Sequence, residues 1–305
     1  MGSALATTLI LVAVGSAWAL STGAPSGGEC GVGAINRFSG RNVLVTGASG
    51  GLGRALAAQL ARCGVATLIL SGRDTVALED AAVECRSAFV QGQGDRDVGK
   101  LRVEIVPCDL SDPGSVRVLG EKALEVCSSV ASPMESGAPG GDNSGVVDVL
   151  LNCGGVSSRS SFLDTAADVD EVLMRVNFLS GSALAKACVP GMVKQREGAI
   201  VWVSSVQGLI GIPMRTSYAA SKFAVQGYCE ALRAELASSG VTVHVASPGY
   251  IRTNLSRSAI KGDGKKYGEM DDNTAKGMLF LLNVEDFAEI STCSICTSLL
   301  IAILS

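Results

Sequence analysis

Histidine is almost absent from this 305-residue sequence, in which His244 is the single example. Ser-His-Asp triads, Cys-His dyads and nearly all catalytic zinc sites require a histidine side chain. His244 lies within Val241–Ala246, a run that alternates like a strand, so we expect its ring to be hydrogen-bonded within a sheet. The scarcity of histidine therefore argues against these three kinds of catalytic site.

A basic excess is missing as well, since 25 Lys and Arg side chains face 29 Asp and Glu, for a net charge of -4. Nucleic acid is therefore not expected as a partner. The 37 glycines follow no three-residue period, which excludes collagen. With 47% hydrophobic residues, the chain is predicted to be globular and able to bury a core without disulfides or a metal.

The ten cysteines show no spacing typical of a disulfide framework. Most lie in apolar runs, where a thiol behaves as a small hydrophobic group. Cys293 and Cys296 form a C-x-x-C pair outside the strand-then-helix context of a redox motif, and we expect both to be free thiols.

Residues 1–28 carry no charged side chain. Within them, Ala4–Leu20 is about long enough to cross a thin bilayer, which predicts a signal anchor. The segment 17–19 has the small-x-small form of a signal-peptidase site, so a cleaved signal peptide is the alternative. Residues 29–40 are interpreted as a linker. The expected location is the endoplasmic reticulum membrane or lumen; a secondary plastid is the alternative, because Ser21–Arg41 is Ser/Gly-rich like a transit segment.

The C-terminal residues 279–305 have an unusual composition. From Ile290 to the end, the chain is largely apolar, uncharged and without periodicity. This stretch fits a buried strand with a tail or a second membrane contact, and it is too short for a standard membrane span.

Between these ends, short β-branched runs alternate with amphipathic helical stretches. The predicted strands are Asn42–Thr46, Ala66–Ser71, Leu101–Pro107, Val146–Leu151, Gly198–Ser204 and Val241–Ala246. The predicted helices are Leu52–Cys63, Val76–Phe89, Pro113–Cys127, Val169–Val189 and Tyr218–Ser238. This alternation predicts an α/β fold, a single Rossmann-like domain over residues 41–278 with a doubly wound parallel sheet. Gln91–Lys100 and Ser128–Ser144 are predicted to be surface loops.

A glycine-rich segment, residues 46–53 (TGASGGLG), joins the first predicted strand to the first predicted helix. Glycines in such a turn let the backbone approach a pyrophosphate, whose charge then faces the N-terminus of the helix. The segment therefore predicts a dinucleotide site near the carboxyl ends of the strands.

The second predicted strand is followed by Arg73 rather than ending in the acidic residue that binds a ribose 2′-hydroxyl. A guanidinium at this place suits a 2′-phosphate, which favours NADP over NAD. Asp74 is the counter-argument, unless it only caps the next helix.

Tyr218 and Lys222 form a Y-x-x-x-K motif. On a helix, residues i and i+4 share a face, so the phenol and ammonium groups project together. We expect the ammonium to lower the pKa of the phenol from about 10 and so to prepare it as a proton donor to a developing alkoxide. Ser205, at the end of the fifth predicted strand, offers a hydroxyl for the substrate carbonyl.

Together these motifs resemble the short-chain dehydrogenase/reductase family from about Arg41 to Met278. Residues 108–110 (CDL) and 248–253 (PGYIRT) follow in the family's order and spacing. The residues after them, 254–256 (NLS) and 267–270 (YGEM), resemble a membrane-anchored branch of that family.

The resemblance implies roles for individual residues. Tyr218 corresponds to the general acid/base, Lys222 to the residue that binds the nicotinamide ribose, and Ser205 to the binder of the substrate carbonyl. Asn177 corresponds to the support of a water relay to Lys222. Asp109 would bind the adenine, and Ile251 and Thr253 the nicotinamide carboxamide. The implied cofactor-binding residues are Thr46, Gly47, Ser49, Gly51, Leu52, Gly53, Arg73, Asp109, Leu110, Asn152, Gly154, Tyr218, Lys222, Pro248, Gly249, Ile251 and Thr253.

The function implied by the resemblance is an NADP(H)-dependent oxidoreductase that interconverts a carbonyl and an alcohol by hydride transfer. A catalytically silent dinucleotide-binding protein and an isomerase or dehydratase of the same family are the alternatives. The implied partners are a small carbonyl or alcohol substrate of lipid-like character, a membrane at the N-terminal segment, and a second copy bound through the helices carrying Asn177 and Tyr218. The substrate and the direction of the reaction stay open.

Two departures from the family pattern stand out. After the fourth predicted strand the family has Asn-Asn-Ala-Gly, whereas residues 152–155 read Asn-Cys-Gly-Gly, which loosens a turn beside the cofactor. After Met278 the family's last helix and strand find no match, so residues 279–305 are predicted to be an atypical or truncated C-terminus. A missing edge strand would expose its neighbour and weaken the sheet.

Overall fold

The computed structural model of the protein describes residues 38–93, 100–129, 145–249, 251 and 253–268. Its strands are β1 Asn42–Thr46, β2 Thr67–Ser71, β3 Arg102–Ile105, β4 Val149–Asn152, β5 Gly198–Val203 and β6 Val241–Ala246. Its helical segments are α3 Gly51–Arg62, α4 Thr75–Gln93, α5 Pro113–Ser128, α6 Ala167–Met174, η1 Arg175–Leu179, α7 Ser180–Gln195, η2 Val206–Gly208 and α8 Thr216–Leu236. The six predicted strands are confirmed.

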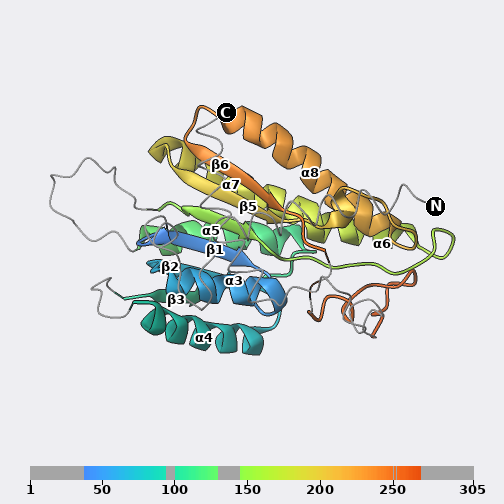
Figure 1. The fold of residues 1–305 in the computed structure, drawn as a ribbon, viewed down its shortest axis with the longest axis horizontal. Coiled ribbons are helices and arrows are strands. Elements are labelled where there is room, and N and C mark those ends of the chain that lie inside the picture. Colours follow the sequence, from blue (N-terminus) through green and yellow to red (C-terminus); the bar gives the residue numbers. More distant parts are fainter. Residues whose placement is uncertain (1–37, 94–99, 130–144, 250, 252, 269–305) are drawn as a thin grey trace, which may run out of the picture.

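The strands form one parallel sheet in the order β3-β2-β1-β4-β5-β6 (Figure 1). The chain builds outward from β1 to β3 and then returns to β4, which pairs with the other side of β1. This reversal between β1 and β4 is the topological switch point, beside which ligands bind in sheets of this kind. The predicted Rossmann-like, doubly wound architecture is confirmed.

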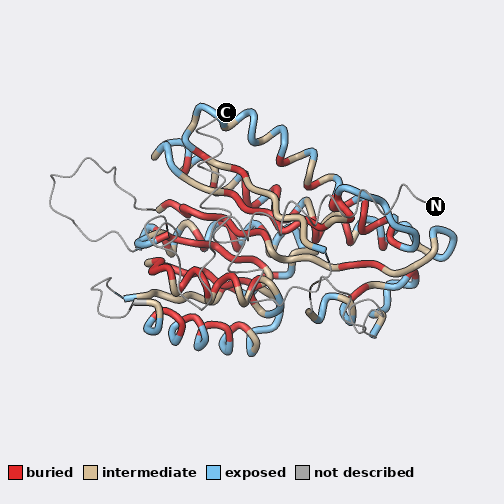
Figure 2. The backbone as a smooth tube through the Cα atoms, in the orientation of Figure 1, coloured by how far each residue is buried: buried red, intermediate tan, exposed pale blue. Residues whose placement is uncertain are grey.

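Helices cover both faces of the sheet, which explains why the strands read as continuous apolar runs. Side chains of β1 alternate between the two layers: Val43 and Val45 pack with α3 and α4, whereas Leu44 packs on the side of α5 and α7. Figure 2 shows the buried backbone running through the strands and along the inner sides of the helices. Phe38, which precedes the first strand, is buried in the same layer as α3.

The predicted helix Val169–Val189 lies within one longer helical run, Ala167–Gln195, that contains a turn of π-helix. The structure divides it into α6, a turn of π-helix at η1 and α7, so one extra residue enters the helical turn at Arg175–Leu179. Turns of this kind often occur at functional sites, and this one carries Asn177. The whole span 167–195 is long and apolar enough to cross a membrane, but half of its most apolar window is buried inside the protein.

His244 pairs with Val201 across the sheet, and its Nε2 lies 3.0 Å from the Thr242 hydroxyl, which confirms the expected strand role. Six described cysteines carry free thiols, and Cys63 is disulfide-bonded. The predicted loop Gln91–Lys100 begins later than expected, because α4 continues to Gln93. Residues 1–28, residues 279–305 and the Cys293–Cys296 pair lie outside the described residues.

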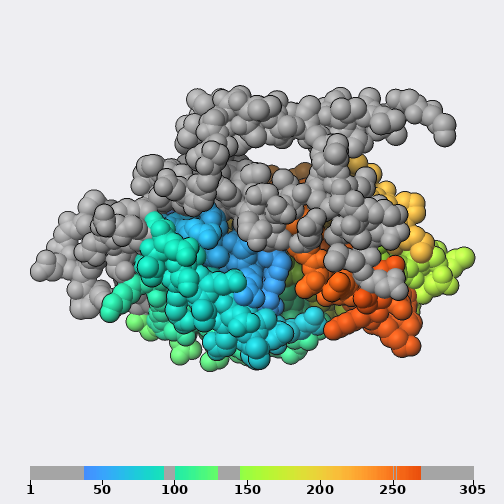
Figure 3. Space-filling view, turned by 60° about the horizontal axis from the view of Figure 1, so that its bottom comes forward, coloured from blue at the N-terminus to red at the C-terminus, as the bar shows by residue number. Residues whose placement is uncertain are grey.

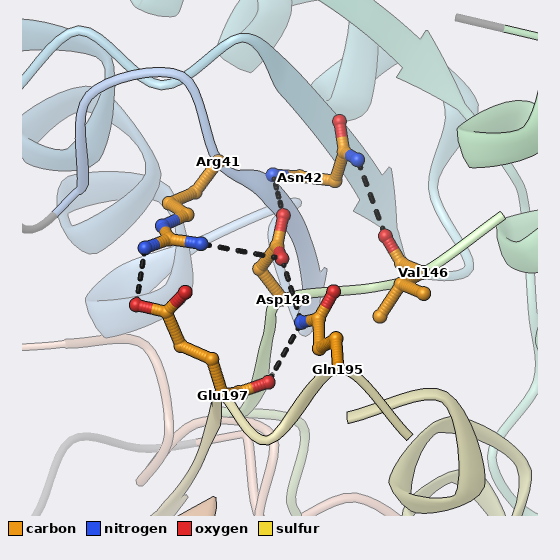
Figure 4. A network of polar contacts seen from close by, with 6 residues as sticks. All are labelled: Arg41, Asn42, Val146, Asp148, Gln195 and Glu197. Atoms are coloured by element: carbon orange, nitrogen blue, oxygen red, sulfur yellow. Dashed lines mark hydrogen bonds and ion pairs between the residues drawn. The ribbon is translucent and has the colours of Figure 1, made fainter. Parts of the chain in front are cut away.

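The amino ends of β1 and β4 are joined by the carboxylate of Asp148, which is 3% exposed (Figure 4). It accepts hydrogen bonds from the Asn42 backbone N–H at 2.8 Å and the Gln195 amide at 3.0 Å. Arg41 lies 3.7 Å from the same carboxylate and also pairs with Glu197. This network ties the sheet to the end of α7 at the edge opposite the switch-point cleft.

We therefore expect Asp148→Ala to lower the free energy of unfolding by about 1–3 kcal/mol, because it leaves the buried Asn42 N–H without its acceptor, while Arg41 keeps its pair with Glu197. Denaturant unfolding of this variant, compared with the exposed Asp80→Ala on α4, measures the effect. Equal stability of the two variants would contradict the structural role of Asp148.

Candidate active site

A cleft opens at the carboxyl ends of β1, β4 and β5, next to the switch point. The glycine segment forms one side of it, and the stretch after β6 forms another; in Figure 3 the blue first βα unit adjoins the orange residues 253–268. The cleft is lined by Gly47, Ser49–Gly53, Gly72, Arg73, Cys108–Leu110, Cys153–Val156, Val176, Val203–Ser205, Tyr218, Lys222, Pro248, Gly249, Ile251, Thr253–Leu255 and Ser258. Most of the residues that the sequence predicts as a site are therefore brought together.

Close backbone approach explains the glycines of the TGASGGLG segment. Gly47 has φ +68°, and a Cβ on it would lie 2.8 Å from the backbone of Gly154 after β4. A Cβ on Gly53 would lie 2.3 Å from the carbonyl oxygen of Gly47. Only glycine allows the loops after β1 and β4 to meet in this way, and their meeting forms the floor of the cleft.

The N-terminus of α3 opens into the cleft without a capping side chain. Its N-cap is Gly50, no side chain bonds to the first turn, and no acidic residue stands in that turn. The free N–H groups and the positive end of the helix dipole form a site suited to a phosphate group. The glycine cradle and this uncapped helix end fit the pyrophosphate of a dinucleotide.

Arg73 lines the end of the cleft beyond Gly72. The neighbouring Asp74 is turned away to α4, where its carboxylate accepts a hydrogen bond from the Ala77 N–H at 3.1 Å. Asp109 lies across from Arg73, and its pKa is lowered by hydrogen bonds from Ser111 and by the Arg73 charge. Asp74 therefore caps the N-terminus of α4.

Lys222 is buried, with 5% of its surface exposed. Its Nζ donates a hydrogen bond to the Val203 carbonyl oxygen at 2.9 Å, which ties α8 to the end of β5. Burial lowers the pKa of this ammonium to about 8. The Nζ lies 5.7 Å from the centroid of the Tyr218 ring, so the two groups face the cleft together, as the Y-x-x-x-K spacing predicts.

Tyr218 is also buried, and burial raises the pKa of its phenol above 10. The hydrogen bond with Ser205 and the charge of Arg215 oppose this rise. The expectation that Lys222 lowers this pKa is therefore wrong for the protein alone: desolvation dominates, and the partners that stabilise a phenolate are Ser205 and Arg215. The phenol is held protonated at neutral pH, which is the state of a proton donor.

Asn177 sits on the π turn with its amide fully engaged. Its Oδ1 accepts from the Val156 N–H at 2.8 Å, while its Nδ2 donates to the Val156 carbonyl at 2.9 Å and to the Ser221 hydroxyl at 2.9 Å. The hydroxyl of Ser221 in turn donates to the Tyr218 carbonyl at 2.7 Å. Asn177 thus fixes the loop after β4 against the helix that carries Tyr218 and Lys222.

The altered motif at residues 152–155 has a compensating neighbour. A Cβ on Gly154 would lie 2.3 Å from Cδ1 of Leu110, so the leucine fills the space of the methyl group that the family's alanine would supply. A Cβ on Gly155 would lie 3.1 Å from the Asn177 Oδ1 and 3.6 Å from the Lys222 Nζ. Cys153 lines the cleft, and burial raises the pKa of its thiol to about 12.

We expect Gly154→Ala to destabilise the protein by about 1–3 kcal/mol, because its methyl group displaces Leu110. The double variant Gly154→Ala/Leu110→Ala should be more stable than Gly154→Ala alone, since the second change makes room. Denaturant unfolding of the two single variants and the double variant measures this coupling. If the stability losses of the two single variants simply add up in the double variant, Leu110 does not compensate for the missing methyl group at Gly154.

Two predicted cofactor residues do not line the cleft. The Thr46 hydroxyl accepts a hydrogen bond from the Gly154 N–H at 3.1 Å and so holds the loop instead. The side chain of Asn152 points under α7, where its Cγ would lie 3.1 Å from a Cβ on Gly181. Strand alternation explains this direction, because Leu150, two residues earlier, faces the same layer.

A smaller pocket adjoins the cleft on the far side of Tyr218 and Ser205. It includes two arginines that the sequence analysis missed, Arg159 and Arg215, together with Gln207. Arg215 is 8% exposed and donates a hydrogen bond to the Ser157 hydroxyl at 3.1 Å. Arg215 is the N-cap residue of α8, three residues before Tyr218, and this nearness along the chain is the signal that the sequence offered. Arg159 comes from a loop whose path the sequence does not reveal.

Comparison with known proteins agrees with this geometry. A family model described as short chain dehydrogenase matches residues 140–263, and a KR domain model matches residues 42–134. Dehydrogenase/reductase SDR family member 7B of Danio rerio is 42% identical over 236 residues, covering 77% of this chain and 69% of the relative. The chain belongs to the short-chain dehydrogenase/reductase family.

Other relatives of this family carry related names. Dehydrogenase/reductase SDR family member 7B of Mus musculus is 40% identical, over 77% of this chain and 65% of its own length. Dehydrogenase/reductase SDR family protein 7-like of Drosophila melanogaster is 39% identical, over 80% of this chain and 67% of its own length. This chain therefore spans about two thirds of the length of these relatives.

Solved structures show the same fold. A short-chain dehydrogenase from Sphingobium yanoikuyae in complex with NADPH superposes with a TM-score of 0.63, at 25% identity and 84% coverage of both chains. A family member from Burkholderia phymatum in complex with NAD gives a TM-score of 0.65, at 24% identity, covering 85% of this chain and 86% of that one.

Proposed function

We propose that this protein is an NADP(H)-dependent oxidoreductase that interconverts a carbonyl and an alcohol. The observation that carries the proposal is one cleft in which an uncapped helix N-terminus and a glycine cradle lie at one end and Ser205, Tyr218 and Lys222 at the other. Membership in the short-chain dehydrogenase/reductase family supports the same reaction class.

The cofactor would lie along the carboxyl ends of β1 and β4. The N-terminus of α3 and the glycines of residues 47–53 would hold its pyrophosphate. Pro248, Gly249, Ile251 and Thr253, on the opposite wall, would border the nicotinamide end. When bound, the cofactor supplies a hydride donor or acceptor next to the substrate carbon.

The chain's own residues handle the proton and the position of the carbonyl. Ser205 donates a hydrogen bond that fixes the substrate oxygen, and Tyr218 gives its phenolic proton to that oxygen as negative charge develops. Lys222, held by the Val203 carbonyl, binds the nicotinamide ribose. Asn177 holds the Val156 loop and α8 at the right distance and supports a water relay to Lys222.

We further propose a preference for NADP over NAD, because Arg73 lines the adenosine end of the cleft and Asp74 is occupied as a helix cap. Arg73→Ala should weaken NADPH binding by roughly tenfold or more, the worth of a hydrogen bond to a charged group. NADH binding should barely change. The affinities for NADPH and NADH are measured by titration for this variant and for the exposed control Arg86→Ala. Equal losses of affinity for the two cofactors would contradict the proposed preference for NADP.

The family relationship also supports proposals beyond the described residues. Residues 1–28 would anchor the protein or direct its export, residues 29–40 would form the linker, and residues 41–278 would be the cofactor-binding domain followed by an atypical tail at 279–305. The proposed location is the endoplasmic reticulum membrane or lumen, with a secondary plastid as the alternative. A reporter fused to residues 1–41 tests this, and a diffuse cytosolic signal would contradict it.

The enzyme proposal is tested by mixing the purified protein with NADPH and a panel of ketones and following the absorbance of the reduced nicotinamide. Oxidation of NADPH that requires a ketone supports the proposal. Cofactor binding without any turnover would favour a silent dinucleotide-binding protein. Substrate conversion without net oxidation of the cofactor would favour an isomerase or dehydratase.

A further inference from the structure

Gln207 lies on the wall of the smaller pocket beside Tyr218, on the short helix η2 that follows β5. It is buried, with 5% of its surface exposed. Within the described part of the chain, its side-chain oxygen Oε1 accepts no hydrogen bond. A buried acceptor without a donor is unfavourable, so native proteins retain few of them. An unpaired acceptor beside the reactive groups of a site therefore points to a donor on the ligand.

The backbone of η2 holds Gln207 in a fixed place. The Gln207 N–H donates to the Ser205 hydroxyl oxygen at 3.2 Å, and the Gly208 N–H donates to the Ser205 carbonyl oxygen at 2.8 Å. A Cβ on Gly208 would lie 2.8 Å from the Lys222 carbonyl oxygen, so η2 packs directly against α8. Gln207 thus stands two residues from the hydroxyl that would hold the substrate carbonyl, on a segment fixed against the helix that carries Tyr218.

The other polar side chains of this pocket are mainly donors. Two guanidinium groups and two hydroxyls line it, those of Arg159, Arg215, Ser157 and Ser256, and its described lining includes no carboxylate. A substituent that only accepts, such as a carboxylate or an ether oxygen, can bond to these donors but leaves the Gln207 Oε1 unpaired. A hydroxyl can donate to Oε1 and accept from a neighbouring donor at the same time. The pocket wall therefore favours a hydroxyl.

The pocket is small and joins the cleft at the reactive groups. Its volume is about 60 Å³, which leaves room for a few non-hydrogen atoms. Ser205, Tyr218 and Ile251 line both the pocket and the cleft, so a carbonyl held by Ser205 would lie where the two meet. The substituent that enters the pocket is then the one attached directly to the carbonyl carbon. A hydroxymethyl group has a suitable size and supplies the hydroxyl.

We propose that the substrate is a ketone with a hydroxyl on the carbon next to the carbonyl, and that the Gln207 Oε1 accepts the hydrogen bond of this hydroxyl. The inference rests on the proposed reductase function, which places the carbonyl at Ser205 and Tyr218. Reduction adds the hydride of NADPH to the carbonyl carbon and the Tyr218 proton to its oxygen, so the products are a vicinal diol and NADP+. Tyr218 regains its proton from water. Gln207 determines specificity, because a ketone without the hydroxyl leaves Oε1 unpaired in the transition state.

Three matched ketones test the proposal in steady-state kinetics of the full chain with NADPH. α-Hydroxyacetophenone carries the hydroxyl, propiophenone replaces it with a methyl group, and α-methoxyacetophenone keeps the oxygen without its donor. For the unmodified protein, kcat/KM should be about tenfold higher for the hydroxyketone than for the other two, the worth of one hydrogen bond to a buried acceptor. The methoxy compound shows whether the electron-withdrawing oxygen alone accounts for the difference.

Gln207→Leu removes the acceptor and keeps the approximate size of the side chain. It should abolish the preference for the hydroxyketone over the methoxy compound and leave the affinity for NADPH unchanged, which also verifies that the variant is folded. Gln226→Leu is the matched control. The Gln226 amide bonds to the Ser204 and Ser247 hydroxyls and does not line either pocket, so this variant should keep the preference of the unmodified protein.

The possible failures of this inference and of the proposed function are distinguishable. Equal kcat/KM values for the hydroxyketone and the methoxy compound in the unmodified protein would overturn the inference, with a water molecule as the partner of Oε1, and would leave the reductase function standing. A preference that survives in Gln207→Leu would overturn the role of Gln207. If the protein reduces none of these three ketones but reduces others of the panel, the inference is also wrong. If it reduces no ketone at all, the reductase function fails, and the inference fails with it.

Discussion

Tyr218→Phe should slow carbonyl reduction by at least roughly 10²–10⁴-fold, the range typical of general acid catalysis. The substitution removes one hydroxyl and keeps the ring, so the packing of Tyr218 against Val169 and Leu173 should survive. The affinity for NADPH should change little, because Lys222 and the glycine segment, rather than the phenol, would hold the cofactor. The rate of ketone reduction and the dissociation constant of NADPH are measured on the same protein preparation.

The same helix offers a matched control for this experiment. Tyr228→Phe also removes one phenolic hydroxyl from α8, but Tyr228 packs edge-on against Phe178 and Trp202 and does not line the cleft. It should retain the rate of the unmodified protein. If Tyr218→Phe keeps that rate too, Tyr218 is not the proton donor.

Lys222→Met should have a different signature, losing both rate and cofactor affinity while changing how stability depends on pH. Burial lowers the pKa of Lys222 to about 8, from 10.5 in the unfolded chain. Between these values the unfolded state binds more protons, so this group makes the free energy of unfolding rise with pH. The pKa shift of about 2.5 corresponds to a change of about 3 kcal/mol in the free energy of unfolding between low and high pH. The Lys222→Met variant lacks this change, because methionine is uncharged.

The quantity to compare is the difference in free energy of unfolding between Lys222→Met and the unmodified protein, because other groups titrate in the same pH range. Burial raises the pKa of the Cys85, Cys127 and Cys188 thiols to about 12, which makes stability fall above pH 9 in both proteins. Denaturant unfolding without cofactor at pH 7, 9 and about 10.5 should show Lys222→Met gaining relative stability at the lowest pH. The exposed Lys186→Met serves as control. Identical pH profiles for all three proteins would contradict the buried, charged state of Lys222.

The strands and the glycine loop could be predicted because their causes are local. Continuous apolar runs arise when helices cover both faces of a sheet, and Gly53 is required by a backbone contact with Gly47 inside the same strand–turn–helix unit. The π turn at Arg175–Leu179 could not be predicted, because a helix with one extra residue per turn has no composition of its own. It is set by the bonds of Asn177 to Val156 and Ser221, which are remote in sequence.

Electrostatics was the least predictable part of the site. The Y-x-x-x-K spacing correctly placed Tyr218 and Lys222 together, but it carries no information on burial, which dominates both pKa shifts. The direction of the Asn152 side chain was missed for a related reason, since the layer that each strand residue faces depends on the register of the whole sheet. Leu110, which fills the space above Gly154, became visible only through their contact.

Transfer of an isotopic label most directly tests whether this cleft carries out reduction. NADPH deuterated on the transferable position of the nicotinamide is incubated with the protein and a ketone that it reduces, and the alcohol is analysed by mass spectrometry. We expect one deuterium on the carbinol carbon of the alcohol formed by the unmodified protein and by Tyr228→Phe, and almost no labelled alcohol from Tyr218→Phe in the same time. Tight NADPH binding with no deuterium in any alcohol from a broad ketone panel would contradict hydride transfer in this cleft.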